Sequence, residues 1–241
     1  MREYIIENKK TILFISIFII ILIILNIVVN LLGDTNKVLV NSYITKLNSN
    51  DLNIDLECEI DKILEYNNIP YFTLSNKVFD EINEEILEET LLRICYQDGY
   101  IDYETSLNNN ILSLAINISH DTIDDLAYVE YKTYNINTNN NTRITNQDLL
   151  KIYNLTLNDV KNKVKGYLTN YYNYEKKNNY INNITFNEYL KLIEYEEITL
   201  NNMNLYVDKK NDLYIFKDYI LTEGMSIDTN YPDLTIKFKL T

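Results

Sequence analysis

The chain has 241 residues, and 46% of them are apolar, which is enough for a hydrophobic core and excludes a wholly disordered polypeptide. The net charge is −13, and this acidity argues against nucleic-acid binding, because phosphate recognition needs clustered Lys and Arg side chains. With only four glycines, a glycine-rich loop that cradles phosphates is not expected either.

Residues 11–32 (TILFISIFIIILIILNIVVNLL) carry no charged side chain and are long enough, as a helix, to cross a bilayer. Three positive side chains precede this segment, and Lys37 is the first one after it. The positive-inside rule therefore predicts a cytoplasmic tail at residues 1–10 and an extracytoplasmic location for the rest. A cleaved signal peptide is the alternative, but VVNLLGD has no small-x-small cleavage site. We predict a retained, single-pass signal anchor in the cell membrane, with the lipid bilayer as a partner.

A short polar stalk is expected at residues 33–50, in part helical around Lys37 to Leu47. Apolar and polar residues then alternate through DLNIDLECEID at residues 51–61. This period of two predicts a strand with one buried face. Residues 1–33 contribute a charge of +1, so the exported part carries −14. An acidic surface suits basic partners, although it also serves solubility.

The next segment predicts a long helix. Pro70 interrupts the chain, Ser75 is a suitable N-cap, and apolar residues follow at helical spacing. Those apolar residues are Val78, Phe79, Ile82, Ile86, Leu91 and Ile94. Asp98-Gly99 supplies the stop signal.

Three strands are expected after this helix. YIDYETSLNNNILSLAINIS, at residues 100–119, predicts two strands joined by a turn at Asn108 to Asn110. Ala127 to Ile136 predicts a third strand, rich in Tyr, Val and Thr. The asparagine run at residues 137–142 resembles low-complexity filler, but Asn tolerates the left-handed conformation and favours turns. We therefore predict a hairpin turn there and not a disordered spacer.

Three Thr-x-x-Asp/Glu patterns then predict helix N-termini, at Thr145, Thr156 and Thr185. NYEKKNNYINN, at residues 173–183, is expected to be a polar linker between two of these helices. A hairpin around Asp208 to Asp212 and a last strand in DLTIKFKL complete the pattern.

Together these elements predict an α+β fold, in which an N-terminal transmembrane helix is followed by an exported domain of antiparallel strands packed on a few helices. We expect residues 51–241 to form one extracytoplasmic domain, or two packed lobes at about 51–137 and 138–241.

No residue pattern predicts catalysis. His120 is the sole histidine, and HDTIDD offers it together with Asp121, Asp124 and Asp125 as metal ligands. A zinc site normally needs further histidines or thiolates, so a polar loop is the preferred interpretation. Cys58 and Cys95 are expected either to form a disulfide in an oxidising compartment or to remain buried free thiols. We expect no enzyme, no cofactor and no metal.

Four segments, in this order, are similar to a known family. NIPYFTLSNKVFDEINEEI (68–86) resembles its Ile-Pro segment before an Asn-containing helix, and NNILSLAINIS (109–119) resembles one of its strands. YKTYNINTNNNTRITNQDLL (131–150) and LYVDKKNDLYIFKDYIL (205–221) resemble two later segments. Residues 51–241 thereby resemble the extracytoplasmic region of RsiV-type anti-sigma factors, which also precedes the catalytic domain of PdaC-type peptidoglycan deacetylases.

The chain departs from the family in two loops. A Gly-Gly-Ala-His element is replaced by SHDTIDDLAYVEY at residues 119–131, and the late segment TEGMSIDTNYPDL has its parts in a different order. In the family both loops would recognise ligand. The resemblance therefore implies the fold more directly than the ligand.

The resemblance implies a binding role at the bacterial cell envelope, toward a cell-wall glycan or a basic protein such as lysozyme. The ten-residue tail is too small to envelop a sigma factor, so sigma inhibition is not expected. One alternative is a single-pass receptor or regulator that signals through a separate partner, and another is a non-catalytic accessory of a cell-wall enzyme. Candidate ligand-binding residues are Tyr128, Tyr131, Tyr134 and Tyr219, although a tyrosine in a strand is also an ordinary half-buried residue.

Overall fold

The computed structural model describes residue 21 and residues 39–48, 60–96, 99–120, 128–178, 183–192, 195–217, 219–220 and 236–241. The chain divides into two compact units, Met1–Ser42 and Tyr43–Thr241, and every element named below belongs to the second unit. Within the described residues, no helix combines the length and the apolar composition that a bilayer crossing requires. The anchor predicted at residues 11–32 lies outside the described residues, apart from Ile21.

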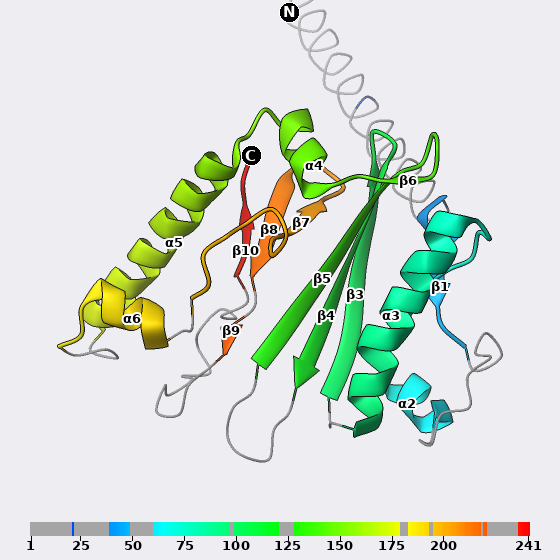
Figure 1. The fold of residues 1–241 in the computed structure, drawn as a ribbon, viewed down its shortest axis with the longest axis horizontal. Helices are drawn as coiled ribbons and strands as arrows, with labels where there is room; N and C mark the ends of the chain where they lie inside the picture. Colours follow the sequence, from blue (N-terminus) through cyan, green and yellow to red (C-terminus); the bar gives the residue numbers. More distant parts are fainter. Residues whose placement is uncertain are drawn as a thin grey trace, which may run out of the picture. The chain divides into compact units, whose positions relative to one another are not determined.

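A five-stranded antiparallel sheet organises the first half of this unit (Figure 1). Its strands are β3 (Gly99–Asn108), β4 (Ile111–His120), β5 (Tyr128–Asn137) and β6 (Thr142–Arg143), and β9 (Tyr219–Ile220) pairs with β5. Asn109 and Asn110 form the β3–β4 turn, with φ angles of 47° and 63°. Two-residue hairpin turns need this left-handed conformation, which asparagine adopts more readily than most residues. The predicted asparagine turn and the three strands predicted after the long helix are confirmed.

The asparagine run after β5 is an ordered turn as well. Asn141 has a φ of 52°, and the Asn137 side chain accepts a hydrogen bond from the Asn139 N–H at 3.0 Å. The Thr138 N–H donates to the Asn110 carbonyl at 2.9 Å, which ties this turn to the β3–β4 turn. The run is therefore a folded hairpin turn, as its composition predicts.

One face of the sheet packs against the long helix α3 (Lys77–Tyr96). Alternate residues of each strand point to this face, and on β4 they are Leu112, Leu114, Ile116 and Ile118. Phe79, Ile82 and Ile86 of α3 belong to the same core and are 0–1% exposed. Two short strands, β1 (Ile44–Lys46) and β2 (Pro70–Phe72), form an antiparallel pair, and α2 (Ile60–Tyr66) lies between them in sequence. The rings of Phe72 and Phe79 stack at 5.0 Å, which joins β2 to α3.

Two buried asparagines bind the open strand edges in this half. The Asn83 side chain on α3 accepts from the Phe72 N–H at 2.8 Å and donates to the Phe72 carbonyl at 2.9 Å. The Asn67 side chain accepts from the Ile101 N–H at 2.6 Å, on the outer edge of β3. Asn83 and Asn67 are only 6% and 4% exposed. Each side chain therefore supplies the hydrogen bonds that a neighbouring strand would otherwise make.

The second half contains α4 (Asn146–Ile152), α5 (Leu157–Lys177), α6 (Phe186–Leu192) and a three-stranded sheet. The antiparallel sheet runs in the order β10 (Ile236–Lys239), β8 (Leu213–Lys217), β7 (Asn204–Val207). Its core is a separate apolar cluster, to which α5 contributes Val160, Val164 and Leu168. The predicted hairpin around Asp208 to Asp212 and the last strand are confirmed over the described residues. The expected α+β class, with antiparallel strands and several helices, is confirmed too.

The predicted helix starts are confirmed by their caps. Thr156 and Asp159 form a capping box at the start of α5, in which the Thr156 N–H donates to the Asp159 carboxylate at 2.8 Å. Thr185 makes the same bond to Glu188 at the start of α6, at 2.7 Å. Hydrogen bonds from the capping threonine hold the pKa of each of these carboxyls below its ordinary value. At the start of α4, the Thr145 hydroxyl accepts a hydrogen bond from the Asp148 N–H at 3.1 Å.

A row of buried polar side chains joins the two sheets. Ser106, Ser113 and Asn135 are direct neighbours across β3, β4 and β5, on the face opposite α3. The edge strand β7 binds this row. Ser106 donates to the Val207 carbonyl, and the Val207 N–H donates to Ser113 Oγ at 3.2 Å. Asn135 Nδ2 donates to the Leu205 carbonyl at 2.8 Å. The three side chains thus supply hydrogen bonds that a neighbouring strand would otherwise make to this edge of β7.

The start of α3 differs from the expectation. Its N-cap is Asn76 and not Ser75, because Asn76 Oδ1 accepts from the N–H groups of Val78 and Phe79 at 3.0 and 3.2 Å. Both residue types are good caps, and the backbone places the asparagine one residue closer to the first free N–H groups.

Three further expectations concern element boundaries. Ile44–Lys46 form β1 and not the end of a stalk helix, because they pair with β2. The helix α5 continues to Lys177, so the linker expected at residues 173–183 is wrong for its first five positions. The strand expected at residues 51–61 lies outside the described residues, except that Ile60 begins α2.

Candidate binding surfaces

The tyrosines proposed as ligand-binding residues do not share one surface. Tyr131 is 4% exposed and packs on the Phe216 ring at 4.8 Å, between the two sheets. Tyr134 lies three positions further along β5 and therefore on the opposite face, where the Arg143 guanidinium sits 5.8 Å from its ring centre. Burial, with the nearby acidic side chains of α3, raises the pKa of Tyr134. Tyr131 is thus a core residue, which corrects its assignment to a ligand surface.

Tyr128 and Tyr219 come together through the backbone. Tyr128 pairs with Ile220, and Tyr219 pairs with Val129, where β9 joins β5. Their side chains lie outside the described part of the structure. The aromatic surface expected there therefore stays a prediction for these two residues.

The other chemistry-bearing residues fall largely outside the described residues. His120 ends β4 with an undescribed side chain, and residues 121–127 follow it. Cys58 is outside as well, and Cys95 is described only as part of the α3 backbone, so both cysteine alternatives stay predictions. Among the side chains that the structure does describe, no group of three or more His, Cys, Asp or Glu could hold a metal ion.

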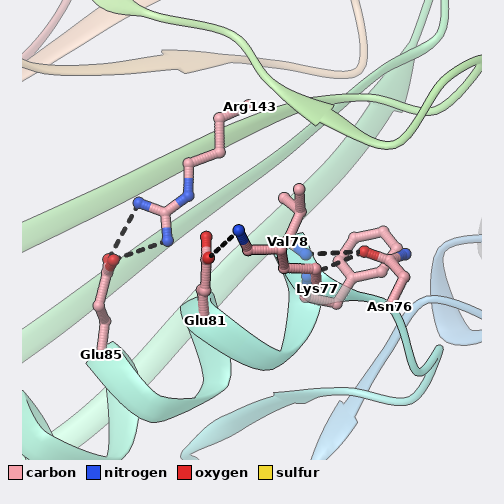
Figure 2. A network of polar contacts seen from close by, with 7 residues as sticks. Asn76, Lys77, Val78, Glu81, Glu85 and Arg143 are labelled. Carbon is pink, nitrogen blue, oxygen red and sulfur yellow. Dashed lines mark hydrogen bonds and ion pairs between the residues drawn. The ribbon is translucent and has the colours of Figure 1, made fainter.

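The solvent face of α3 is strongly acidic. The helix carries six acidic residues and two basic ones, a net charge of −4 in 20 residues. Figure 2 shows three contacts at its N-terminal half: Asn76 caps the helix, Lys77 pairs with Glu81, and Arg143 reaches from β6 to Glu85. The Arg143–Glu85 contact is bidentate, with distances of 2.7 and 3.1 Å. One carboxylate in each of these pairs is thereby neutralised.

A second row of carboxylates on α3 has no such partner among the side chains that the structure describes. Asp80, Glu84 and Glu88 are exposed and stand four residues apart, so they line one side of the helix. No ion pair joins them to another side chain in the described ranges. Like charges at this spacing repel one another and destabilise a helix slightly. The acidic row therefore does not stabilise α3.

A surface pocket of about 280 Å³ lies between α5 and α6. One face of α5 lines the pocket with Asn158, Lys161, Asn162, Lys165 and Leu168, which recur at helical spacing. Phe186 and Leu190 of α6, with Tyr195 and Glu197 after it, form the opposite wall. The apolar members are buried or half-buried, Lys161 is half-buried, and the amides, Lys165 and Glu197 are exposed. The pocket therefore has an apolar floor and a polar rim.

The rim of this pocket is cationic. Lys161 pairs with Glu197, and hydrogen bonding from this lysine holds the pKa of Glu197 below its ordinary value. Lys165 makes no ion pair with any described side chain. The helix α5 as a whole carries five basic and two acidic residues, a net charge of +3 in a chain of −13. The pocket is thus a locally positive site on an acidic protein.

One buried carboxyl group lies further along α5. Glu175 is 7% exposed, and its Oε2 atom has no hydrogen-bond partner within the described residues. Burial raises the pKa of this carboxyl, and hydrogen bonds from Tyr171 and Tyr189 oppose that shift in part. Tyr171 and Tyr189 therefore bond to this carboxyl, whereas Tyr174 on the same helix is 54% exposed.

Sequence reasoning missed both the acidic row and the pocket. The spacing of Asp80, Glu84 and Glu88 was readable in the chain, because four-residue spacing on a helix places side chains on one face. The pocket was not readable in this way. It requires α6 and Tyr195 to lie beside α5, and no local signal in the sequence predicts that contact.

No protein-family model matches this chain, and no curated protein sequence is significantly similar to it.

Proposed function

We propose that this chain is a membrane-anchored, extracytoplasmic binding domain of the bacterial cell envelope, and that it binds a basic protein on the acidic face of α3. The observation that carries the proposal is the row of Asp80, Glu84 and Glu88, whose carboxylates are exposed and lack a counter-ion among the described side chains. A partner that brings Lys or Arg side chains would relieve the repulsion within the row. The predicted anchor and the resemblance to RsiV-type domains support the location.

The rigidity of this face also supports a docking role. Glu81 and Glu85 are held by Lys77 and Arg143, and Lys132 holds Glu89 at 3.2 Å. Phe79, Ile82 and Ile86 anchor the other side of the helix in the core. Asp80, Glu84 and Glu88, which have no counter-ion among the described side chains, thus stand on a helix whose other side is anchored in the core, and this lowers the cost of ordering the helix on binding.

Lysozyme is the basic protein that the resemblance suggests as a probe. We expect the full chain, kept in mild detergent, to bind lysozyme with an affinity that falls steeply between 50 and 300 mM salt, since surface charge pairs are screened. The double variant Glu84→Gln/Glu88→Gln should bind at least about fivefold more weakly at low salt. Binding is measured by interferometry on immobilised lysozyme.

The matched control is Glu65→Gln/Glu196→Gln, which removes the same charge from exposed positions on α2 and after α6. If this control weakens binding as much as the α3 variant does, the net charge and not the α3 face is responsible. Absence of any binding at 50 mM salt would remove lysozyme as the partner.

A further inference from the structure

The pocket between α5 and α6 is chemically unlike the acidic face of α3 and does not depend on the function proposed for that face. Its floor contains Phe186 and Tyr195, each half-buried, together with the buried Leu168. A volume of about 280 Å³ is near the lower end for small-molecule sites, so it suits a single ring and not an extended chain.

The rim adds two kinds of polar group. Asn158 and Asn162 each present a donor and an acceptor, and hydroxyl groups require this combination because they both donate and accept. Lys161 and Lys165 add positive charge above the same floor. An aromatic acid would use the rings and the lysines but would leave the amides unpaired.

We infer that this pocket is a binding site for a pyranose sugar that carries a carboxylate. The apolar C–H face of the ring lies on the aromatic floor, the hydroxyl groups bind the two asparagine amides, and the carboxylate binds the lysines. The positive rim is required because the rest of this acidic chain repels an anion.

Glu197 has a defined part in this site. Its carboxylate forms an ion pair with Lys161 in the structure, so the sugar carboxylate competes with it for the same ammonium group. Removal of the Glu197 charge therefore frees Lys161 and also removes a repulsive group from the rim. A variant that binds more tightly than the natural chain is the expected consequence.

The test is calorimetric titration of the full chain in detergent with four sugars. N-acetylmuramic acid and glucuronic acid carry a carboxylate, and N-acetylglucosamine and glucose are their neutral counterparts. We expect each acid to bind at least about fivefold more tightly than its neutral counterpart, as one charge-assisted hydrogen bond provides. Tighter binding of N-acetylmuramic acid than of glucuronic acid identifies a cell-wall amino sugar as the source, and the reverse order identifies a uronic-acid polymer.

Three variants tie the binding to the pocket. Lys165→Gln should remove most of the preference for the acids, and Lys177→Gln, an exposed lysine of the same helix outside the pocket, should leave it unchanged. Glu197→Gln should raise the affinity for the acids and leave that for the neutral sugars unchanged. Equal affinities for acid and neutral sugars, or a Glu197→Gln variant that binds the acids more weakly, would overturn the inference. Neither result depends on whether lysozyme binds α3.

Discussion

The two long helices of this protein have nearly the same length and opposite character. The helix α3 has 20 residues and a net charge of −4, whereas α5 has 21 residues and a net charge of +3. Each packs on its own apolar core, α3 against the five-stranded sheet and α5 against the three-stranded sheet. A chain with a net charge of −13 thus still carries a cationic surface. Net charge alone therefore predicts the partner of neither helix.

The buried faces of the two helices differ as well. The core side of α3 includes Asn83, which makes two hydrogen bonds to the backbone of β2. The core side of α5 is apolar over its first three turns, and its one buried polar group is Glu175, near the C-terminal end. The helix α3 is bonded to β2 through a buried asparagine. The helix α5 combines apolar packing and its cap with bonds from Lys163 and Tyr172 to the carbonyls of Leu240 and Ile184, at 2.6 and 2.7 Å.

The largest expected effect comes from breaking the polar bond on α3. Asn83→Ala leaves the N–H and carbonyl of Phe72 without their partner, and both are shielded from water. We expect a loss of about 2–4 kcal/mol in the free energy of unfolding, because each buried unsatisfied group costs about 1–3 kcal/mol. Urea unfolding followed by circular dichroism measures it. Asn162→Ala, an exposed asparagine on α5, serves as control and should change stability by less than about 0.5 kcal/mol.

On α5, the buried carboxyl of Glu175 makes the free energy of unfolding depend on pH. The folded state raises the pKa of Glu175, so its stabilising effect is full below the ordinary glutamate pKa and is lost as the pH rises through the folded value. We expect Glu175→Gln to unfold like the natural chain at pH 4 and to be more stable at pH 7. Urea midpoints at the two pH values test this.

Glu188 provides the control of opposite sign. The capping bond lowers its pKa, so its stabilising effect is present above the ordinary glutamate pKa and is lost as the pH falls through the folded value. Glu188→Gln should therefore cost stability at pH 7. A Glu175→Gln variant that also loses stability at pH 7 would contradict the assignment of a destabilising buried charge.

The caps of the two helices should respond differently to acid. Thr156→Ala on α5 and Asn76→Ala on α3 are each expected to cost about 1 kcal/mol at pH 7. The Thr156 cap is reinforced by the ionised Asp159, whose lowered pKa means that its contribution is lost in strong acid. The cost of Thr156→Ala should therefore shrink at pH 3, while that of Asn76→Ala should not. An equal pH response of both variants, in urea unfolding, would show that the carboxylate adds nothing to the α5 cap.

The smallest expected change in stability comes from the acidic row of α3, which is also the proposed binding surface. Glu84→Gln removes the middle charge of Asp80, Glu84 and Glu88, and two repulsive four-residue spacings disappear with it. We expect a gain of about 0.5 kcal/mol at low salt, which declines as salt screens the charges. A loss of stability in thermal unfolding would mean that Glu84 has a structural role. In that case a loss of binding in a Glu84→Gln variant could arise from a folding defect.

Local signals in the sequence predicted much of the fold. Asparagine pairs and threonine caps act within a few residues, so Asn109, Asn110, Thr156 and Thr185 could be assigned without knowledge of the tertiary structure. The asparagine turn between β3 and β4 predicted these two strands in the same way. Ser75 and Asn76 are both good N-cap residues, so the sequence did not show which of these neighbours caps α3.

Features that depend on distant contacts could not be predicted. Ser106, Ser113 and Asn135 occupy alternate strand positions that are typical of a solvent-facing side, yet they are buried because β7 covers them. The tyrosines raised a similar difficulty: their spacing places Tyr131 and Tyr134 on opposite faces, but only the tertiary fold shows that Phe216 covers Tyr131. The candidate pocket likewise requires two helices and a loop that only the tertiary fold brings together.

The polar row beneath β7 also governs the order in which this protein can fold. Its bonds join residues 101, 94 and 70 positions apart in the chain. Hairpins of neighbouring strands form early, because they close short loops, whereas contacts over such distances form slowly. Until β7 has been synthesised and docked, three polar side chains lie uncovered on β3, β4 and β5. A chain that ends before Val207 therefore lacks the strand that covers them.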